Sequence, residues 1–154
     1  MAEFLEGIGL PVEIADGLGQ TFLPGITARN GILAIDEARL LYPGDLLHEA
    51  GHLAMLRPQD RIRADGNMGD DGGLEMSAIA WSYAAAIHLG IAPSVVFHES
   101  GYKGGSQALL ENFAAGRFIG VPMLEWAGLT VGERRAKALG VPGYPAMLRW
   151  LRQE

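Results

Sequence analysis

Two histidines one helical turn apart, with a glutamate beside the first, are the residues of this chain best suited to chemistry. They stand in the run His48-Glu49-Ala50-Gly51-His52. On a helix, positions 48 and 52 lie about 40° and about 6 Å apart on one face, so both imidazoles can bind one metal ion. Zinc accepts neutral imidazole nitrogen and, in catalytic sites, keeps one coordination position for water. Glu49 can then take a proton from that water as the water attacks a carbonyl, and return it to the leaving amine.

A zinc site of this kind needs a third protein ligand. The downstream candidates are Asp65, Asp70, Asp71, Glu75, His88 and His98. Glu75 is the strongest, because it stands at the head of an apolar stretch, residues 74–89, where a buried carboxylate needs a partner such as a metal ion. The alternative is that Glu75 is an exposed first-turn acid favoured by the helix dipole. His88 lies about 220° round the same predicted helix from Glu75, so the two are not expected to share a site.

This arrangement resembles the gluzincin metallopeptidases, in which a helix bearing His-Glu-x-x-His is followed by a second helix that supplies a glutamate. The residues that carry the resemblance are His48, Glu49, His52 and the run Glu75-Met76-Ser77-Ala78. The short chain and the strand-like segment 31–36 are more similar to the compact bacterial forms, the minigluzincins and the ImmA/IrrE-like proteins. The resemblance implies that His48, His52 and Glu75 bind zinc, and that Glu49 is the general base and then the general acid.

One position departs from the thermolysin-like pattern, which has an aspartate four residues after the ligand glutamate to orient a ligand imidazole. Ile79 stands there in this chain, so another group must orient the histidines. Peptide deformylases are excluded, because they use a cysteine ligand and the chain has no cysteine. Metzincins are excluded, because residues 53–57 do not continue the His-x-x-Gly-x-x-His pattern. A third histidine ligand at position 88 or 98 would instead resemble the SprT-like proteins.

A glycine-rich segment, residues 98–105, offers candidates for stabilising a transition-state oxyanion. It carries an imidazole, a phenol and an ammonium group on His98, Tyr102 and Lys103. An oxyanion that forms beside zinc needs a hydrogen-bond donor. His98 and Tyr102 are therefore the candidates for this catalytic role, and Tyr83 is a weaker one. The alternative is an ordinary surface loop.

The composition favours one compact domain spanning residues 1–154. A chain of 154 residues buries roughly two thirds of its unfolded surface, enough to hold a metal site rigidly. The net charge of −6 argues against a general nucleic-acid partner, which needs a basic face on the protein. The apolar window 76–97 is interrupted by polar residues, by Gly90 and by Pro93, which favours a core helix over a membrane span.

A cytoplasmic location is expected from the amino terminus and from cysteine usage. The first six residues contain two glutamates where a secretory signal would carry Lys or Arg. The absence of cysteine is compatible with a reducing compartment.

The elements that must position these residues indicate an α+β domain, with a small N-terminal antiparallel sheet followed by a mostly helical, zincin-like core. Strands are predicted at residues 12–14, 20–23 and 31–35, after a short helix at 3–8. Helices are predicted at 46–56 with Asp45 as N-cap, at 74–89, at 107–115 behind Ser106, at 130–140 from a capping box, and at 145–152 behind Pro145.

Two further segments, one strand and one connector, complete this interpretation. By the same resemblance, the strand at 31–35 would border the cleft and pair with extended substrate backbone; the alternative is an ordinary buried strand. Residues 57–73 are expected to form a solvated connector, because arginines and aspartates alternate along them.

Three functions are compatible with the sequence. The first is zinc-dependent hydrolysis of a peptide or protein substrate by metal-activated water. The second is a binding or regulatory domain that keeps the helix pair, with or without metal, and does not hydrolyse peptides. The third is a structural site closed by four ligands, His48, His52, Glu75 and His98, with no open position. An intact Glu49 favours catalysis, whereas Ile79 favours the second function.

Overall fold

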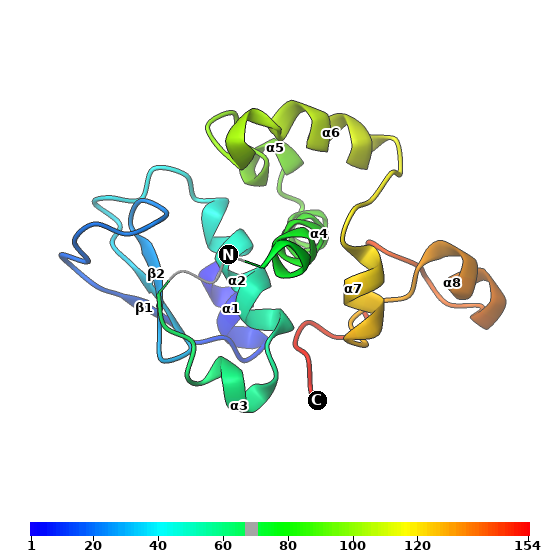
Figure 1. Cartoon of the computed structure of the whole chain (residues 1–154), viewed down its shortest axis with the longest axis horizontal. Coiled ribbons are helices and arrows are strands. Elements are labelled where there is room, and N and C mark those ends of the chain that lie inside the picture. The colour runs from blue at the N-terminus through cyan, green and yellow to red at the C-terminus, as the bar shows by residue number, and fades with distance from the viewer. Residues whose placement is uncertain (67–70) are drawn as a thin grey trace.

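The computed structural model describes residues 1–66 and 71–154 (Figure 1). In chain order the elements are α1 Ala2–Gly7, β1 Val12–Ile14, β2 Ile26–Arg29, β3 Ile32–Ile35, α2 Asp45–Met55, α3 Pro58–Arg61, α4 Gly72–Leu89, α5 Pro93–Val96, the 3-10 turn η1 Tyr102–Gly104, α6 Ser106–Ala114, α7 Val121–Trp126 and α8 Glu133–Leu139. A small sheet thus lies near the N-terminus and helices follow it, which confirms the predicted α+β class.

The sheet is mixed, which corrects the prediction of an antiparallel sheet. Its strand order is β1-β3-β2, and β3 runs parallel to β1 and antiparallel to β2. The strand predicted at 20–23 is also wrong, because the second strand lies at 26–29. Around the predicted position, the Thr21 hydroxyl donates to the Leu23 carbonyl and accepts from the Gly25 N–H, at 2.6 and 3.1 Å. Such local hydrogen bonds compete with a strand ladder.

The central place of β3 overturns the expectation that residues 31–35 form a substrate-pairing edge. That strand is hydrogen-bonded on both sides, so it is the buried strand of the alternative interpretation. The outer edge of β2 is also paired within the chain: Ile26 bridges Leu23, and Ala28 bridges Gly66. The Gly66 N–H donates to the Ala28 carbonyl at 3.0 Å.

The two long helices α2 and α4 pack against each other at the centre of the molecule (Figure 1). All residues of α2 are buried. The helices approach closely at Gly51, where a Cβ atom would lie 2.9 Å from the Cα of Ala78. Asp71 caps α4 by accepting from the N–H groups of Gly73 and Leu74 at 2.7 and 3.1 Å. The pair forms a rigid frame for side chains that project between the two helices.

Several predicted helix starts are wrong, because the polar side chain at each has another partner. Asp45 is the first residue of α2 and Gly44 its N-cap, since the Asp45 carboxylate pairs with His98. The Ser106 hydroxyl donates to the carbonyls of His98 and Gly101 instead of capping α6. The Thr130 hydroxyl donates to the Ala146 carbonyl, so the capping box does not form and α8 starts only at Glu133. The helix α7 was not predicted.

The C-terminal segment is irregular, which corrects the helix predicted at 145–152. It is held by tertiary contacts: the indole N–H of Trp81 donates to the Trp150 carbonyl at 2.9 Å, and the Arg61 guanidinium donates to the Arg152 carbonyl at 2.8 Å. Phe4 of α1 packs edge-on against the Trp150 ring at 4.9 Å. Both ends of the chain are therefore anchored on the central helices.

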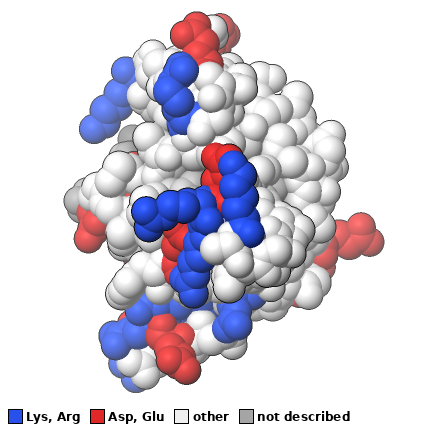
Figure 2. Space-filling model, turned by 90° about the vertical axis from the view of Figure 1, so that its right-hand side faces the viewer, with Lys and Arg blue, Asp and Glu red and all other residues white. Residues whose placement is uncertain are grey.

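The connector expected at 57–73 contains the short helix α3, and part of it, residues 67–70, lies outside the described residues. Lys and Arg side chains gather on the face that carries α8, with acidic side chains among them (Figure 2). Lys137 pairs there with Glu133 across one turn of α8 at 2.7 Å. None of the helices in the described ranges is long and apolar enough to traverse a bilayer.

Candidate metal centre

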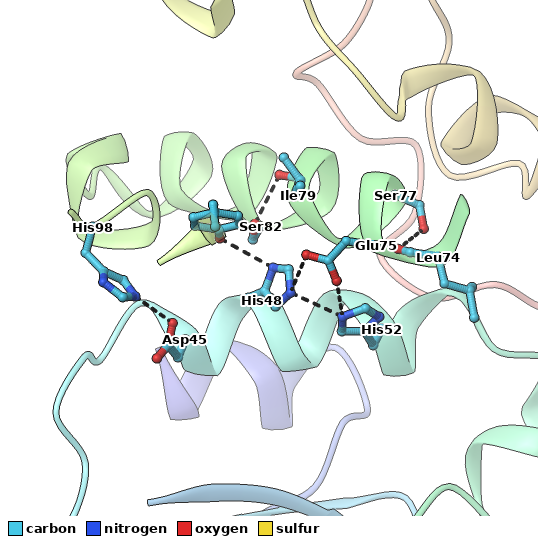
Figure 3. A network of polar contacts seen from close by, with 10 residues as sticks. Asp45, His48, His52, Leu74, Glu75, Ser77, Ile79, Ser82 and His98 are labelled. Atoms are coloured by element: carbon cyan, nitrogen blue, oxygen red, sulfur yellow. Dashed lines mark hydrogen bonds and ion pairs between the residues drawn. The ribbon is translucent and has the colours of Figure 1, made fainter. Parts of the chain in front are cut away.

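His48 and His52 project from successive turns of α2 toward Glu75 in the first turn of α4 (Figure 3). Their Nε2 atoms are 3.2 Å apart. The Glu75 carboxylate straddles the pair, with Oε1 3.4 Å from Nε2 of His48 and Oε2 3.3 Å from Nε2 of His52. Within the described ranges, these three residues form a group, the metal group, whose ligand atoms all lie within 4.8 Å of one another. The three ligands predicted from the sequence therefore converge.

The spacing of these atoms suits a tetrahedral ion. Bonds from zinc to imidazole nitrogen and carboxylate oxygen are about 2.0–2.2 Å long, and the edge of a tetrahedron is about 1.6 times its bond length, or about 3.3–3.6 Å. The separations of 3.2, 3.4 and 3.3 Å lie at or near that range. Two imidazoles and one carboxylate are also a donor set that zinc accepts. The group could therefore hold a metal ion.

The group is buried on the side of α2 and open on the side of Glu75. The side chains of His48 and His52 are 9% and 1% exposed, whereas that of Glu75 is 37% exposed. Burial alone would raise the pKa of Glu75, but hydrogen bonds from His48 and His52 and their charges hold this pKa well below its usual value. Glu75 is thus an ionised carboxylate whose open flank leaves room for a further ligand.

Glu49 lies next to the group but is not part of it. It is buried and lines the cleft on which the group opens. Burial raises the pKa of Glu49, against the opposing charges of His52 and His48. A carboxylate with a raised pKa is a stronger proton acceptor, which is the property a general base needs near neutral pH.

His98 is held apart from the group by Asp45. Its Nε2 lies 2.9 Å from Asp45 Oδ1, and its ring stacks on Tyr42 with 3.9 Å between centroids. Its Nδ1 is buried and has no hydrogen-bond partner among the described residues. Because His98 is not in the group of potential ligands, the described residues do not form the four-ligand site of the third function.

Tyr102 contacts His48, a predicted ligand, on the side of its ring that faces away from Glu75. Its phenol oxygen lies 3.4 Å from Nδ1 of His48, the ring nitrogen that points away from Glu75, and the two rings meet edge to face at 85°. Tyr83, the weaker candidate, packs against the rings of Phe97 and Phe113.

The other candidate ligands lie elsewhere. Asp71 caps α4, and His88 packs beside the rings of Phe4 and Trp150. Asp65 is exposed, and Asp70 lies outside the described residues.

Asp45 and Ser82 are the site-region residues that the sequence analysis missed. Asp45 stands three residues before His48, so the spacing of one helical turn could have suggested that both face one cleft. Ser82 lies on α4 seven residues, or about two helical turns, after Glu75, so its spacing could likewise have placed it on the helix face of Glu75.

A cleft of about 900 Å³ opens onto the group. Apolar side chains form much of its wall, among them those of Phe22, Ile79, Leu109 and Ile119. Its volume lies within the range of sites that bind small molecules. Ile79 thus presents a hydrocarbon surface where the thermolysin-like pattern has an aspartate.

Comparison of the chain with protein-family models, with curated proteins and with solved structures finds no match. The case for a metal centre therefore rests on the geometry of the group itself.

Proposed function

We propose that this protein is a cytoplasmic zinc-dependent peptidase, a single zincin-like domain that hydrolyses a peptide bond with metal-activated water. One observation carries the proposal: two imidazole nitrogens and a carboxylate converge at tetrahedral spacing, with a separate buried carboxylate, Glu49, beside them. A site with a purely structural metal has no use for that second carboxylate. The substrate is a peptide or protein chain entering the cleft.

In this proposal His48, His52 and Glu75 hold the metal ion. Bound zinc supplies Lewis acidity that polarises a carbonyl and lowers the pKa of water. Glu49 accepts the proton of the attacking water and delivers it to the leaving amine. The open flank of Glu75 admits water and substrate from the cleft.

His98 is the candidate donor to the developing oxyanion. Asp45 accepts a hydrogen bond at its Nε2, whereas its Nδ1 has no partner. Donation from Nδ1 to a negatively charged oxygen requires a ring with a proton on each nitrogen and access of that oxygen to this buried atom. Tyr102 ranks below His98 for this role, because its phenol already contacts His48.

A second candidate function is a binding or regulatory domain that keeps the helix pair, with or without the ion, and does not hydrolyse peptides. It is favoured by His52, whose Nδ1 has no hydrogen-bond partner among the described residues. Histidine ligands are usually oriented through that nitrogen, and losing the orienting group lowers metal affinity or activity 10–100-fold.

Metal analysis of the purified protein, combined with a generic peptide-cleavage assay, tests the proposal. We expect one zinc per chain in the wild type and in Glu49→Gln, little zinc in His52→Ala, and cleavage in the wild type alone. His88→Ala is the matched control, because this histidine lies outside the group, and it should keep both zinc and activity. If the wild type and Glu49→Gln bind equal zinc and no protein cleaves the peptide, the second function is favoured. If His52→Ala binds as much zinc as the wild type, His52 is not a ligand.

A further inference from the structure

The two histidines of the metal group differ at the ring nitrogen that points away from Glu75. Nδ1 of His52 has no partner among the described residues, whereas Nδ1 of His48 faces the phenol of Tyr102 at 3.4 Å. Ile79, which stands where an orienting aspartate is expected, has no hydrogen-bonding atom in its side chain. We propose that Tyr102, backed by Ser82, is the positioning residue that orients His48 and fixes the tautomer that can bind the metal. This inference rests on the proposed metal site.

The proton count of a neutral imidazole favours such a partner. The ring carries one N–H, so Nε2 can bind a metal only if the proton sits on Nδ1. The buried Nδ1–H of His48 then needs an acceptor, and the phenol oxygen is in place to accept. Without that acceptor, moving the proton to Nε2 would cost less and would block the ligand position.

The phenol has its own proton, which the proposed relay passes on to Ser82 of α4. Figure 3 shows Ser82 near His48, with its hydroxyl directed to Ile79. Besides His48, the polar neighbour of the phenol is the Ser82 hydroxyl. That hydroxyl donates to the Ile79 carbonyl at 3.0 Å. In the proposed relay the phenol donates to the Ser82 oxygen, so that each donor from His48 to the Ile79 carbonyl has an acceptor. The proposed relay thus ends at the main-chain carbonyl of Ile79, whose side chain has no hydrogen-bonding atom.

The side chain of Tyr102 can accept and donate at the same time. A phenol with the ordinary tyrosine pKa of about 10 keeps its proton at neutral pH. The hydroxyl group can therefore accept from His48 while donating onward.

The backbone holds the phenol in position. Tyr102 and Lys103 have φ angles of 55° and 52°, a conformation that is uncommon for residues with a side chain. Such strain persists only where neighbouring contacts enforce it. Here the Ser106 hydroxyl binds the carbonyls of His98 and Gly101, and the Phe97 ring packs edge-on against Tyr102 at 5.4 Å.

The zinc dissociation constant, measured by competition with a chromophoric chelator, tests the relay. We expect Tyr102→Phe, which removes only the hydroxyl, to bind zinc 10–100-fold more weakly than the wild type. Tyr83→Phe is the matched control and should leave the constant unchanged. Ser82→Ala should cause a smaller loss. Combined with Tyr102→Phe it should add nothing, because it acts through the phenol.

A second measurement separates positioning from general loosening of the fold. In the zinc-loaded wild type, NMR should show a slowly exchanging Nδ1 proton on His48, and Tyr102→Phe should lose that protection while circular dichroism stays unchanged. If Tyr102→Phe does not fold, Ser82→Ala alone must weaken zinc binding, and unchanged affinity overturns the inference.

The outcomes distinguish this inference from the proposed function. A wild type that binds zinc, together with a Tyr102→Phe variant of equal affinity and equal proton protection, overturns the relay and leaves the peptidase proposal standing. A wild type that binds no zinc overturns both.

Discussion

At the scale of single residues, His98 has a ring held by two neighbours and one ring nitrogen without a hydrogen-bond partner among the described residues. Asp45 holds Nε2, Tyr42 stacks on the ring, and Nδ1 is buried without a partner among the described residues. Replacing His98 with Phe keeps an aromatic ring on Tyr42 but removes the donor. We expect kcat to fall about 10²–10³-fold, the loss typical of removing one oxyanion donor.

Two measurements check this prediction: kcat at saturating peptide, and zinc content. Zinc content should stay at the wild-type level, because His98 is outside the metal group. His88→Phe serves as control and should lower neither quantity. If His98→Phe loses zinc, His98 is a ligand, and the third function of the sequence analysis returns.

The sequence predicted the metal group because its signals are local. His48, Glu49 and His52 lie within one helical turn or so, and Glu75 heads the next apolar run. The contacts Asp45–His98 and His48–Tyr102 could not be predicted from local patterns, since they join residues that are 53 and 54 positions apart. Their formation depends on how the segment 98–105 packs over α2, and no local pattern encodes that path.

At the scale of elements, the group depends on how closely α2 approaches α4. Gly51 permits this approach, because a Cβ atom there would lie 2.9 Å from the Cα and 3.0 Å from the carbonyl oxygen of Ala78. We expect Gly51→Ala to push the helices apart, lower the free energy of unfolding by about 1–3 kcal/mol and weaken zinc binding, since Glu75 and the histidines lie on different helices.

Urea denaturation and the zinc competition assay measure these effects. Gly72→Ala is the matched control, because no atom of the described residues, apart from those of its chain neighbours, lies within 4 Å of the Cβ position at Gly72. That variant should stay within about 0.5 kcal/mol of the wild type. A Gly51→Ala variant as stable as Gly72→Ala would show that the interface can adapt.

The long periodic elements were predictable, and so were several short ones: the strands predicted at 12–14 and 31–35 and the helix predicted at 3–8 match β1, β3 and α1. The helices at 46–56 and 74–89 match α2 and α4 because each presents several turns of consistent pattern. The strand at 26–29 pairs with β3 across the two-residue turn Asn30–Gly31, a local hairpin signal that the prediction overlooked. The end of the chain is irregular, because hydrogen bonds to distant residues outweigh weak local preference there. The parallel pairing of β1 with β3 is likewise non-local.

At the scale of the whole molecule, Trp150 ties the two chain ends to the central helices. Its ring packs on Phe4 and Trp81, and its carbonyl accepts from the Trp81 indole. We expect Trp150→Ala to lower the free energy of unfolding by about 3 kcal/mol, near the lower end for truncating a packed Trp.

Trp126→Ala is the natural comparison, because Trp126 is 66% exposed and its ring contacts the Arg152 guanidinium at 4.3 Å. That exposed contact contributes about 0.5–1 kcal/mol. Thermal unfolding followed by circular dichroism should rank Trp150→Ala well below Trp126→Ala. Equal melting temperatures would mean that the C-terminal segment is not part of the cooperative unit.

The pairing of β2 has a consequence for how a ligand is recognised. Leu23 and Gly66 already occupy the main-chain groups of Ile26 and Ala28 along that strand's outer edge. Under the proposed peptidase function, a polypeptide substrate would find few main-chain groups available there and would be bound mainly through its side chains. Recognition through side chains instead of the backbone would make the proposed enzyme selective for a few residues of its substrate.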